Sequence, residues 1–308
     1  MPFVTLILIL AAIGLLVLLV AYICAQMVFA VHSTGRDEPK LPEGSQYRPL
    51  REKIAALIAE AEAMPYEDVY VDSFDGLRLH GKLYRVDPKA PTHILFHGYR
   101  SSALLDFSGG LLDVVKRGHN AILVDQRAHA KSQGKYLSFG ILERRDCLAW
   151  IDYASELSGQ GPIVIEGVSM GAATVMMASE LELPENVIGI LADAGYSSPE
   201  KIIRYVMGKR HYPQLLFPFI RLGGLIFAKF DICSATPAEA LKSCRIPVYF
   251  IHGDDDRFVP YEMGQENYAA CSAKKFFFTG KGAGHAISYL VDREGYRQVH
   301  SQFMEEIL

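Results

Sequence analysis

The stretch that decides the fold reads PIVIEGVSMGAA and runs from Pro162 to Ala173. β-Favouring residues lead into a Gly-x-Ser-x-Gly pentapeptide, and small helix-forming residues follow it. This order predicts a strand, a sharp turn and a helix. The turn brings the two backbones so close together that a Cβ at either glycine would clash. We expect Ser169 at strained backbone angles, with its Oγ raised between the strand end and the helix start.

The composition suits one large soluble domain with an apolar appendage. The 308 residues are 50% hydrophobic and carry a formal net charge of −4, which gives no indication of nucleic-acid binding. The five cysteines are scattered and lack Cys-x-x-Cys spacing, so they predict neither a disulfide framework nor a zinc site. The absence of an Asn-x-Ser/Thr sequon disfavours a glycosylated lumenal domain.

The run from Phe3 to Val31 contains no charged residue. It is longer than the ~20 residues with which a helix crosses a bilayer. A cleaved signal peptide and a buried core helix are the alternatives, and residues 28–30 could serve as a cleavage site. A signal peptide would have a basic amino-terminal region and a shorter apolar core. We therefore predict an uncleaved transmembrane anchor in residues 1–32.

Basic residues lie on only one side of this span. No Lys or Arg precedes it, and four follow closely: Arg36, Lys40, Arg48 and Arg51. The positive-inside rule therefore predicts a single-pass protein with its main domain on the cytoplasmic side. Residues 33–65 are predicted to form a polar linker, up to residue 50, and an amphipathic helix over residues 51–64.

From residue 66 to residue 308 the pattern is that of one α/β domain. A hairpin is predicted around Asp75-Gly76. Six further short apolar strands alternate with helices, and a closing helix is predicted over residues 288–308. This order predicts an eight-stranded, mostly parallel sheet with helices on both faces. Functional groups of such sheets gather at the carboxyl ends of the strands.

Two loops are predicted to surround the serine with hydrogen-bond donors. Acyl transfer requires two N–H groups aimed at the oxyanion of the tetrahedral intermediate. The backbone N–H of Met170 is one candidate, and that of Tyr99, in the motif HGYR after a predicted strand, is the other. Asp125 and His129 follow the next strand, and both precede Ser169. We interpret their loop as a brace for the oxyanion turn rather than as a source of the catalytic acid or base.

The acid and the base are predicted in two later loops. Residues 254–256 are three aspartates after the strand 246–251, where a carboxylate could orient a histidine. A solvated loop or a cation site is the alternative, although the ligand spacing of a calcium loop is absent. His285 lies between small residues in the loop after the strand 275–278. It follows the aspartates in the chain, and its loop leaves it free to reach a neighbouring site. The alternative interpretation is an ordinary histidine in a surface loop.

In the order Ser169, Asp256, His285, the sequence resembles the α/β-hydrolase superfamily. It is most similar to bacterial membrane-anchored hydrolases of the Bem46-like and serine aminopeptidase-like (S33) groups. The resemblance covers residues 66–308 and rests on the motifs HGYR, DQRAHAKS, GVSMG, HGxxDxxVP and GxGH. In the family pattern the aspartate three residues before Val-Pro is the triad acid, which implies Asp256 rather than its neighbours. Ala130 departs from the pattern, since many relatives have glycine there.

The resemblance implies a serine hydrolase that needs no metal and no organic cofactor. The apolar region 198–237 either packs as helix faces on a core or forms a cap over a hydrophobic substrate, and we favour the cap. Together with the membrane anchor, this cap favours a small-molecule or lipid-like ester as the substrate. Peptide, thioester and lactone substrates stay open, because the fold alone does not select among these reactions. A non-catalytic, membrane-tethered binding protein is the alternative, and nothing indicates an oligomeric state. The predicted substrate contacts are Leu216, Phe217, Phe219 and Ile220.

Overall fold

A computed structural model describes residues 2–32, 41 and 43–308 of the chain. Residues 33–40 and 42, which belong to the predicted linker, lie outside the described residues. The linker ends in a short 3-10 helix, η1 (Arg48–Leu50), and the predicted amphipathic helix follows as α2 (Arg51–Glu62). Its apolar face contributes Ile54, Leu57 and Ile58 to the interior.

The predicted eight-stranded, mostly parallel sheet is confirmed. The strand order is β1-β2-β4-β3-β5-β6-β7-β8. β1 and β2 form the predicted hairpin and pair antiparallel, whereas β3 to β8 are parallel to one another. All carboxyl ends of the parallel strands therefore meet at one edge. The strands are β1 (Glu67–Asp72), β2 (Arg78–Tyr84), β3 (Thr92–Phe96), β4 (Asn120–Val124), β5 (Ile163–Val168), β6 (Val187–Asp193), β7 (Val248–Gly253) and β8 (Lys275–Gly280).

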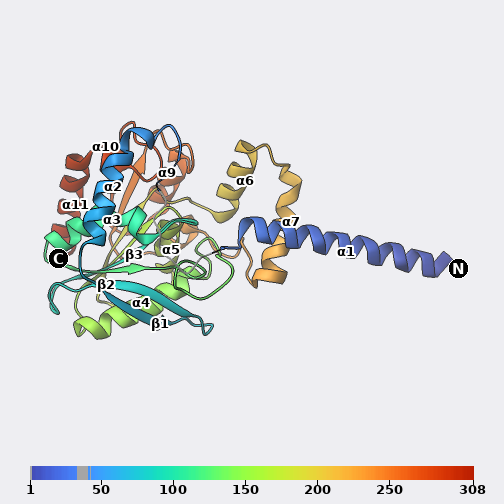
Figure 1. The fold of residues 1–308 in the computed structure, drawn as a ribbon, viewed down its shortest axis with the longest axis horizontal. Helices are drawn as coiled ribbons and strands as arrows, with labels where there is room; N and C mark the ends of the chain where they lie inside the picture. Colours follow the sequence, from blue (N-terminus) through green and yellow to red (C-terminus); the bar gives the residue numbers. More distant parts are fainter. Residues whose placement is uncertain (1, 33–40, 42) are drawn as a thin grey trace.

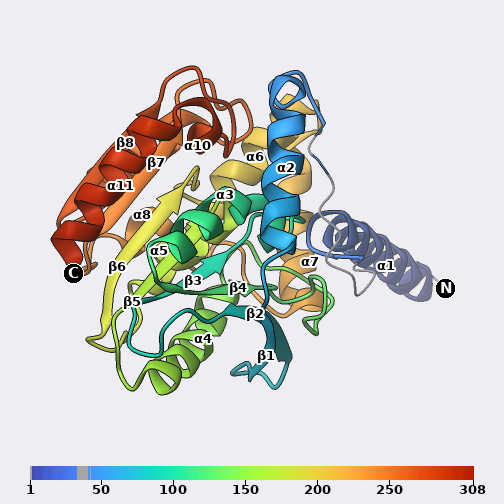
Figure 2. The same ribbon diagram turned by 60° about the vertical axis from the view of Figure 1, so that its left-hand side comes forward.

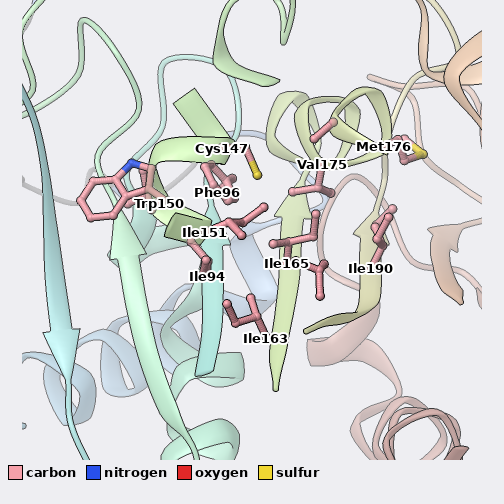
Figure 3. Packing of buried hydrophobic residues seen from close by; sticks show 14 of the residues in the cluster. Ile94, Phe96, Cys147, Trp150, Ile151, Ile163, Ile165, Val175, Met176 and Ile190 are labelled. Atoms are coloured by element: carbon pink, nitrogen blue, oxygen red, sulfur yellow. The ribbon is translucent and has the colours of Figure 1, made fainter. Parts of the chain in front are cut away.

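Helices cover both faces of this sheet because alternate strand residues point to opposite sides. On one face, Ile163 and Ile165 of β5 belong to the same buried cluster as Trp150 and Ile151 of α4 (Glu143–Ser158), as Figure 3 shows. Val164, between them, packs with Phe303 of α11 on the other face. The helices of the two layers are α3 (Ala103–Lys116), α4 (Glu143–Ser158), α5 (Met170–Ala178), α8 (Pro237–Ala240), α9 (Tyr261–Ala270), α10 (Ser288–Val291) and α11 (Arg293–Ile307).

Two details of the helices differ from the sequence-based expectation. The closing helix is interrupted at Asp292. The side chain of this residue accepts a hydrogen bond from Gly295 N and so caps the start of α11. An Asp at a helix start satisfies N–H groups that have no partner inside the helix, so it favours a new helix over a continuous one. Helix α9 was not predicted, because its apolar residues are few and its pattern is weak.

The region 198–237 forms a separate helical layer beside the sheet (Figures 1 and 2). It contains α6 (Pro199–Lys209), a 3-10 turn η2 (Gln214–Leu216), α7 (Phe217–Gly223) and a π-helical turn η3 (Gly224–Ala228). The amino-terminal helix α1 (Pro2–Val28) meets this layer at one end and projects away from the domain at the other (Figure 1). An 18-residue window of its segment Phe3–Val28 has a mean hydropathy of 3.2, and the segment is long enough to span a membrane.

Candidate active site

The strand–turn–helix predicted around Ser169 is present between β5 and α5. Ser169 has φ 55° and ψ −110°, a strained conformation for a residue other than glycine. The steric reason for both glycines is confirmed. A Cβ at Gly167 would lie 2.1 Å from the carbonyl carbon of Gly171, and one at Gly171 would lie 1.8 Å from the carbonyl oxygen of Phe96. The turn therefore tolerates no side chain at either position.

The structure brings Ser169, His285 and Asp256 together from three separate strand ends. His285 Nε2 lies 3.0 Å from Ser169 Oγ, and His285 Nδ1 lies 2.7 Å from Asp256 Oδ2. Both distances are those of hydrogen bonds. The order hydroxyl, imidazole, carboxylate is the arrangement that activates a serine, because the imidazole can accept the hydroxyl proton while the carboxylate orients the ring.

The three aspartates of the loop after β7 have different surroundings. Asp256 is buried, and its Oδ1 accepts hydrogen bonds from the backbone N–H groups of Phe258 and Val259 at 2.8 and 2.9 Å. These bonds hold the carboxylate so that Oδ2 faces His285. Asp254 and Asp255 are exposed; the first accepts from Gly282 N, and the second pairs with Arg257. Neither is among the hydrogen-bond partners of His285.

Charge pairing sets the ionisation of the acid and the base. Burial alone would raise the pKa of Asp256, but the charge of His285 and hydrogen bonds from His252 and His285 hold the pKa below its usual value. For His285, burial disfavours the charged ring, yet Asp256 raises its pKa above the ordinary value by charge and by hydrogen bonding. The pair is therefore arranged to stabilise an imidazolium next to a carboxylate.

The loop after β3 lies directly against the serine. A Cβ at Gly98 would be 3.3 Å from Ser169 Cβ, so this loop could not approach as closely with a larger residue. Gly98 N donates to Asp106 Oδ2 of α3 at 2.6 Å. Gln126 braces the loop from the neighbouring turn, donating through its backbone N–H to His97 Nε2 at 3.2 Å and through its side chain to His97 O. Tyr99 follows in this braced loop.

Met170 is the first residue of α5, and the first N–H groups of a helix have no partner within it. Asp125 and His129 have hydrogen-bond partners on β2 and within their own turn, respectively. Asp125 Oδ2 lies 2.6 Å from His80 Nδ1, and His129 Nδ1 lies 2.9 Å from Arg127 O. Ala130 has φ 42°, in the region that favours the glycine of the family pattern.

Comparison with known proteins gives relatives in sequence and in structure. No protein-family model matches the chain. The uncharacterized protein YqkD of Bacillus subtilis is 25% identical over 225 residues, covering 70% of this chain and 72% of its own length. The α/β hydrolase domain-containing protein WAV2 of Arabidopsis thaliana is 25% identical over 286 residues, covering 87% and 85%.

The Pyrococcus furiosus esterase Pf2001 superposes with a TM-score of 0.63 at 22% identity, covering 90% of this chain and 99% of that one. Mouse α/β hydrolase domain-containing protein 10 superposes with a TM-score of 0.59 at 19% identity, covering 79% and 100%. The chain has the α/β-hydrolase fold. The strand order, the Gly-x-Ser-x-Gly turn and the position of the later histidine agree with this fold.

Two hollows of this α/β-hydrolase fold meet at the serine, and Ser169, Tyr99 and Phe258 line both. The first hollow has a volume of about 360 Å³ and contains polar side chains, among them Glu43, Ser101, Asp106 and Asp193. The second has a volume of about 430 Å³ and is lined mainly by apolar side chains, with Arg100, Arg210, Ser169, Tyr99, Tyr196 and Tyr212 as its polar residues. A substrate bound at Ser169 would thus face a polar hollow and an apolar hollow of the protein.

The apolar hollow corrects part of the predicted substrate contacts. Leu216 and Ile220 line it, but Phe217 and Phe219 do not. Phe217 is buried in the cap, with the Arg204 guanidinium 4.0 Å from its ring centroid, and Phe219 packs beside the same cluster. Since a helix turns 100° per residue, neighbouring apolar residues cannot all face one cavity.

Other residues of the site were missed by sequence reasoning. Asp193, at the end of β6, accepts a hydrogen bond from Ser169 N through its carbonyl oxygen at 2.8 Å. Burial raises the pKa of its carboxyl to about 7. Its position at a strand end was a usable signal. The contact of Asp106 with Gly98 had no signal in the sequence. Residues of α1, including Ile23, Cys24 and Met27, line the apolar hollow, although the sequence predicted a separate anchor.

Proposed function

We propose that this protein is a membrane-anchored serine hydrolase that cleaves carboxylic esters with hydrophobic acyl groups. The observation that carries the proposal is the hydrogen-bonded series Ser169–His285–Asp256 at the edge of an apolar hollow. The structural similarity to the Pyrococcus esterase supports the same reaction class. The apolar α1 supports the anchor, and the basic residues that follow it in the sequence support a domain on the cytoplasmic side.

In the proposed mechanism, Ser169 Oγ attacks the ester carbonyl carbon while His285 Nε2 accepts the hydroxyl proton. The tetrahedral intermediate carries its negative charge on the former carbonyl oxygen, to which the N–H groups of Tyr99 and Met170 donate. The carbon–oxygen bond to the alcohol then breaks, and His285 gives its proton to the departing oxygen. Water attacks the acyl-enzyme by the reverse proton path, releasing the acid and restoring Ser169.

The two hollows suggest which part of the ester lies on each side. The acyl chain gains most from the apolar hollow, since burial of a CH₂ group is worth about 0.8 kcal/mol. The alcohol would leave through the polar hollow, which Ser101 and Asp106 line together with Ser169. This assignment favours esters whose polar portion is the alcohol.

Labelling with a fluorophosphonate tests the proposal, because this reagent forms a bond with an activated serine. We expect the label on Ser169 in the peptide map of the wild-type protein, and none on that peptide in Ser169→Ala. His285→Ala should slow labelling by roughly 10²–10⁴-fold, as expected for loss of a general base. Ser108→Ala, a buried serine of the polar hollow, is the matched control and should label normally.

A wild-type protein that fails to label while remaining folded would support the non-catalytic alternative. If labelling succeeds, turnover of matched ester, thioester and anilide substrates decides the bond type. Thioester or peptide cleavage faster than ester cleavage would replace the proposed esterase activity with a thioesterase or peptidase activity on the same residues.

A further inference from the structure

The carboxyl-terminal part of α1 is packed into the domain. Ala21 and Ala25 are fully buried, as is Phe29 just after the helix. A Cβ at Gly223 of α7 would lie 2.3 Å from the carbonyl oxygen of Ala21. Contact this close between two helices requires small residues on both. Figures 1 and 2 show α7 beside the domain end of α1, so this end of the helix is held by the cap.

The end of α1 is also bonded to the loop that lies against Ser169. Tyr99 Oη donates to the carbonyl oxygen of Val28 at 2.9 Å, and Arg100 Nη2 donates to that of Met27 at 2.9 Å. The last carbonyls of a helix have no partner inside it, and a cation is favoured at that end of the helix dipole. The membrane helix and the proposed oxyanion loop are therefore joined by two neighbouring residues.

One face of α1 forms a wall of the apolar hollow. Its residues there are spaced as one helical stripe: Val20, Ile23, Cys24, Met27 and Val28. The opposite wall comes from α6 and α7, and Ser169 lies at the inner end. Ile23, Met27 and Tyr212 line the hollow and are 47%, 55% and 44% exposed, so they mark its opening. The opening thus adjoins the apolar surface that α1 would present to lipid.

The length of α1 places this opening near the lipid ester groups. The segment Phe3–Val28 has 26 residues. At 1.5 Å per residue it is about 39 Å long, whereas the hydrocarbon core is about 30 Å thick. Its last turns therefore extend into the interfacial layer, where the polar ends of lipids lie. Of the wall residues, Ile23, Cys24, Met27 and Val28 belong to those turns, and Val20 lies one turn before them.

We propose that α1 is part of the acyl-binding site and that the substrate is an acyl ester dissolved in the bilayer. Its chain passes between α1 and the α6–α7 layer, and its carbonyl group reaches Ser169. This inference rests on the proposed function and adds a substrate class and a route of entry. A water-soluble ester would have to reach the same opening against the lipid.

Substitutions on α1 of the full-length protein in phosphatidylcholine vesicles test the wall. The probes are a fluorophosphonate with a hexadecyl chain and one with an ethyl group. Ile23→Trp should slow labelling by the hexadecyl probe at least roughly tenfold and leave the ethyl probe within about twofold, because the side chain fills the chain site. Ile13→Trp, on the same helix at 53% exposure and outside the hollow, is the matched control and should change neither rate.

If Ile23→Trp fails to fold, labelling by both probes will be lost. A second variant at the same position keeps the test informative in that case. Ile23→Ala removes contact area without adding bulk, and it should slow the hexadecyl probe alone by roughly fivefold. Equal effects of Ile23→Ala on both probes, or no effect of it on either, would overturn the role of α1 as a wall.

Dilution of the bilayer tests the route of entry. Additional phosphatidylcholine at constant bulk concentration of the hexadecyl probe should slow labelling in proportion to the fall in its surface concentration. A rate that follows only the bulk concentration would overturn entry from the bilayer. If the ethyl probe does not label Ser169 in the wild-type protein, the proposed function fails; if it labels while dilution and both Ile23 variants have no specific effect, only this inference fails.

Discussion

Asp256 and Asp254 are carboxylates of one loop, and asparagine substitutions separate their roles. An amide at position 256 would keep Oδ1 for Phe258 N and Val259 N but would present N–H to His285. The ring would then carry its proton on Nε2 and could not accept one from Ser169. We expect Asp256→Asn to lower kcat by roughly 10³–10⁴-fold, measured with a chromogenic ester.

Asp254→Asn is the matched control for that prediction. Asp254 is exposed and accepts one hydrogen bond from Gly282 N, which an asparagine oxygen can also accept. Its effect on kcat should stay within roughly fivefold, as for surface substitutions. A severe defect in Asp254→Asn together with a mild one in Asp256→Asn would show that the acid has been misassigned.

The raised pKa of His285 predicts an acid limb in the pH profile. The base works only as neutral imidazole, so kcat/KM should fall as the pH drops through the pKa of His285. The charge of Asp256 raises this pKa above the ordinary value of 6.5, with smaller contributions from Asp193 and Asp106. The midpoint of the limb should therefore lie above pH 6.5. It is measured from kcat/KM at limiting ester concentration between about pH 5 and about pH 9, a range that brackets the usual pKa of histidine.

Asp193→Asn tests whether neighbouring carboxylates raise the pKa of His285. Asp193, whose pKa burial raises to about 7, is only partly ionised in this pH range, and Asp193→Asn removes that partial charge near His285. The midpoint should therefore move by a small amount to lower pH, while the hydrogen bond from Ser169 N to the backbone of residue 193 is kept. A midpoint that does not move, or that moves to higher pH, would contradict the electrostatic account of this histidine.

Individual site residues were predictable where the determinant is local. Gly167, Ser169 and Gly171 follow from the sterics of one turn, and the geometry that they require is present. His285 and Asp256 required the additional order and spacing of the family pattern. The contact of Asp106 with Gly98 was not predictable, because it depends on how α3 packs on the sheet, which no local pattern encodes.

At the scale of elements, Leu216 and Phe217 are sequence neighbours with different surroundings, and this difference gives a test of the cap. Leu216 lines the apolar hollow, whereas Phe217 is buried between Arg204 and the cap interior. We expect Leu216→Ala to lower kcat/KM for long-chain esters by roughly fivefold more than for acetate esters. Phe217→Ala should instead reduce the free energy of unfolding by about 3–5 kcal/mol.

The readouts are the ratio of kcat/KM for the two esters and the thermal midpoint of unfolding. Phe217→Ala should leave the ratio unchanged at a temperature where it is folded. A changed ratio in Phe217→Ala, with an unchanged ratio in Leu216→Ala, would reverse the assignment of these side chains. Composition identified the region as apolar, but only the helical phase decides which of its residues face the hollow.

The sheet and its helices were predictable because the apolar strands are short and regularly spaced, as in Ile163–Val168. The role of α1 was not. A long uncharged helix has the same composition whether it only anchors a domain or also lines a cavity. Small residues at Ala21, Ala25 and Gly223 allow the second arrangement, and their meaning depends on a contact between segments some two hundred residues apart in the sequence.

On the scale of the whole molecule, the two hollows match the two ends of an amphiphilic ester. The apolar hollow opens beside α1, and it meets the polar hollow, which is lined by Glu43 and Asp106, at Ser169. An amphiphilic ester at a membrane surface has the same arrangement, with its chain toward the lipid and its alcohol toward water. The serine would then lie at the boundary between the two phases.

We expect the mature protein to retain α1. Cleavage after residues 28–30 would remove the bonds of Tyr99 and Arg100 to the end of α1 and would disturb the bridge between Ala30 and Tyr136. Because these contacts hold the loop next to Ser169, we expect the intact amino terminus in the active protein. Mass spectrometry should find the uncleaved chain, and an alkaline wash should leave it in the membrane fraction. An active chain that begins near Val31, or release by the wash, would refute an integral anchor.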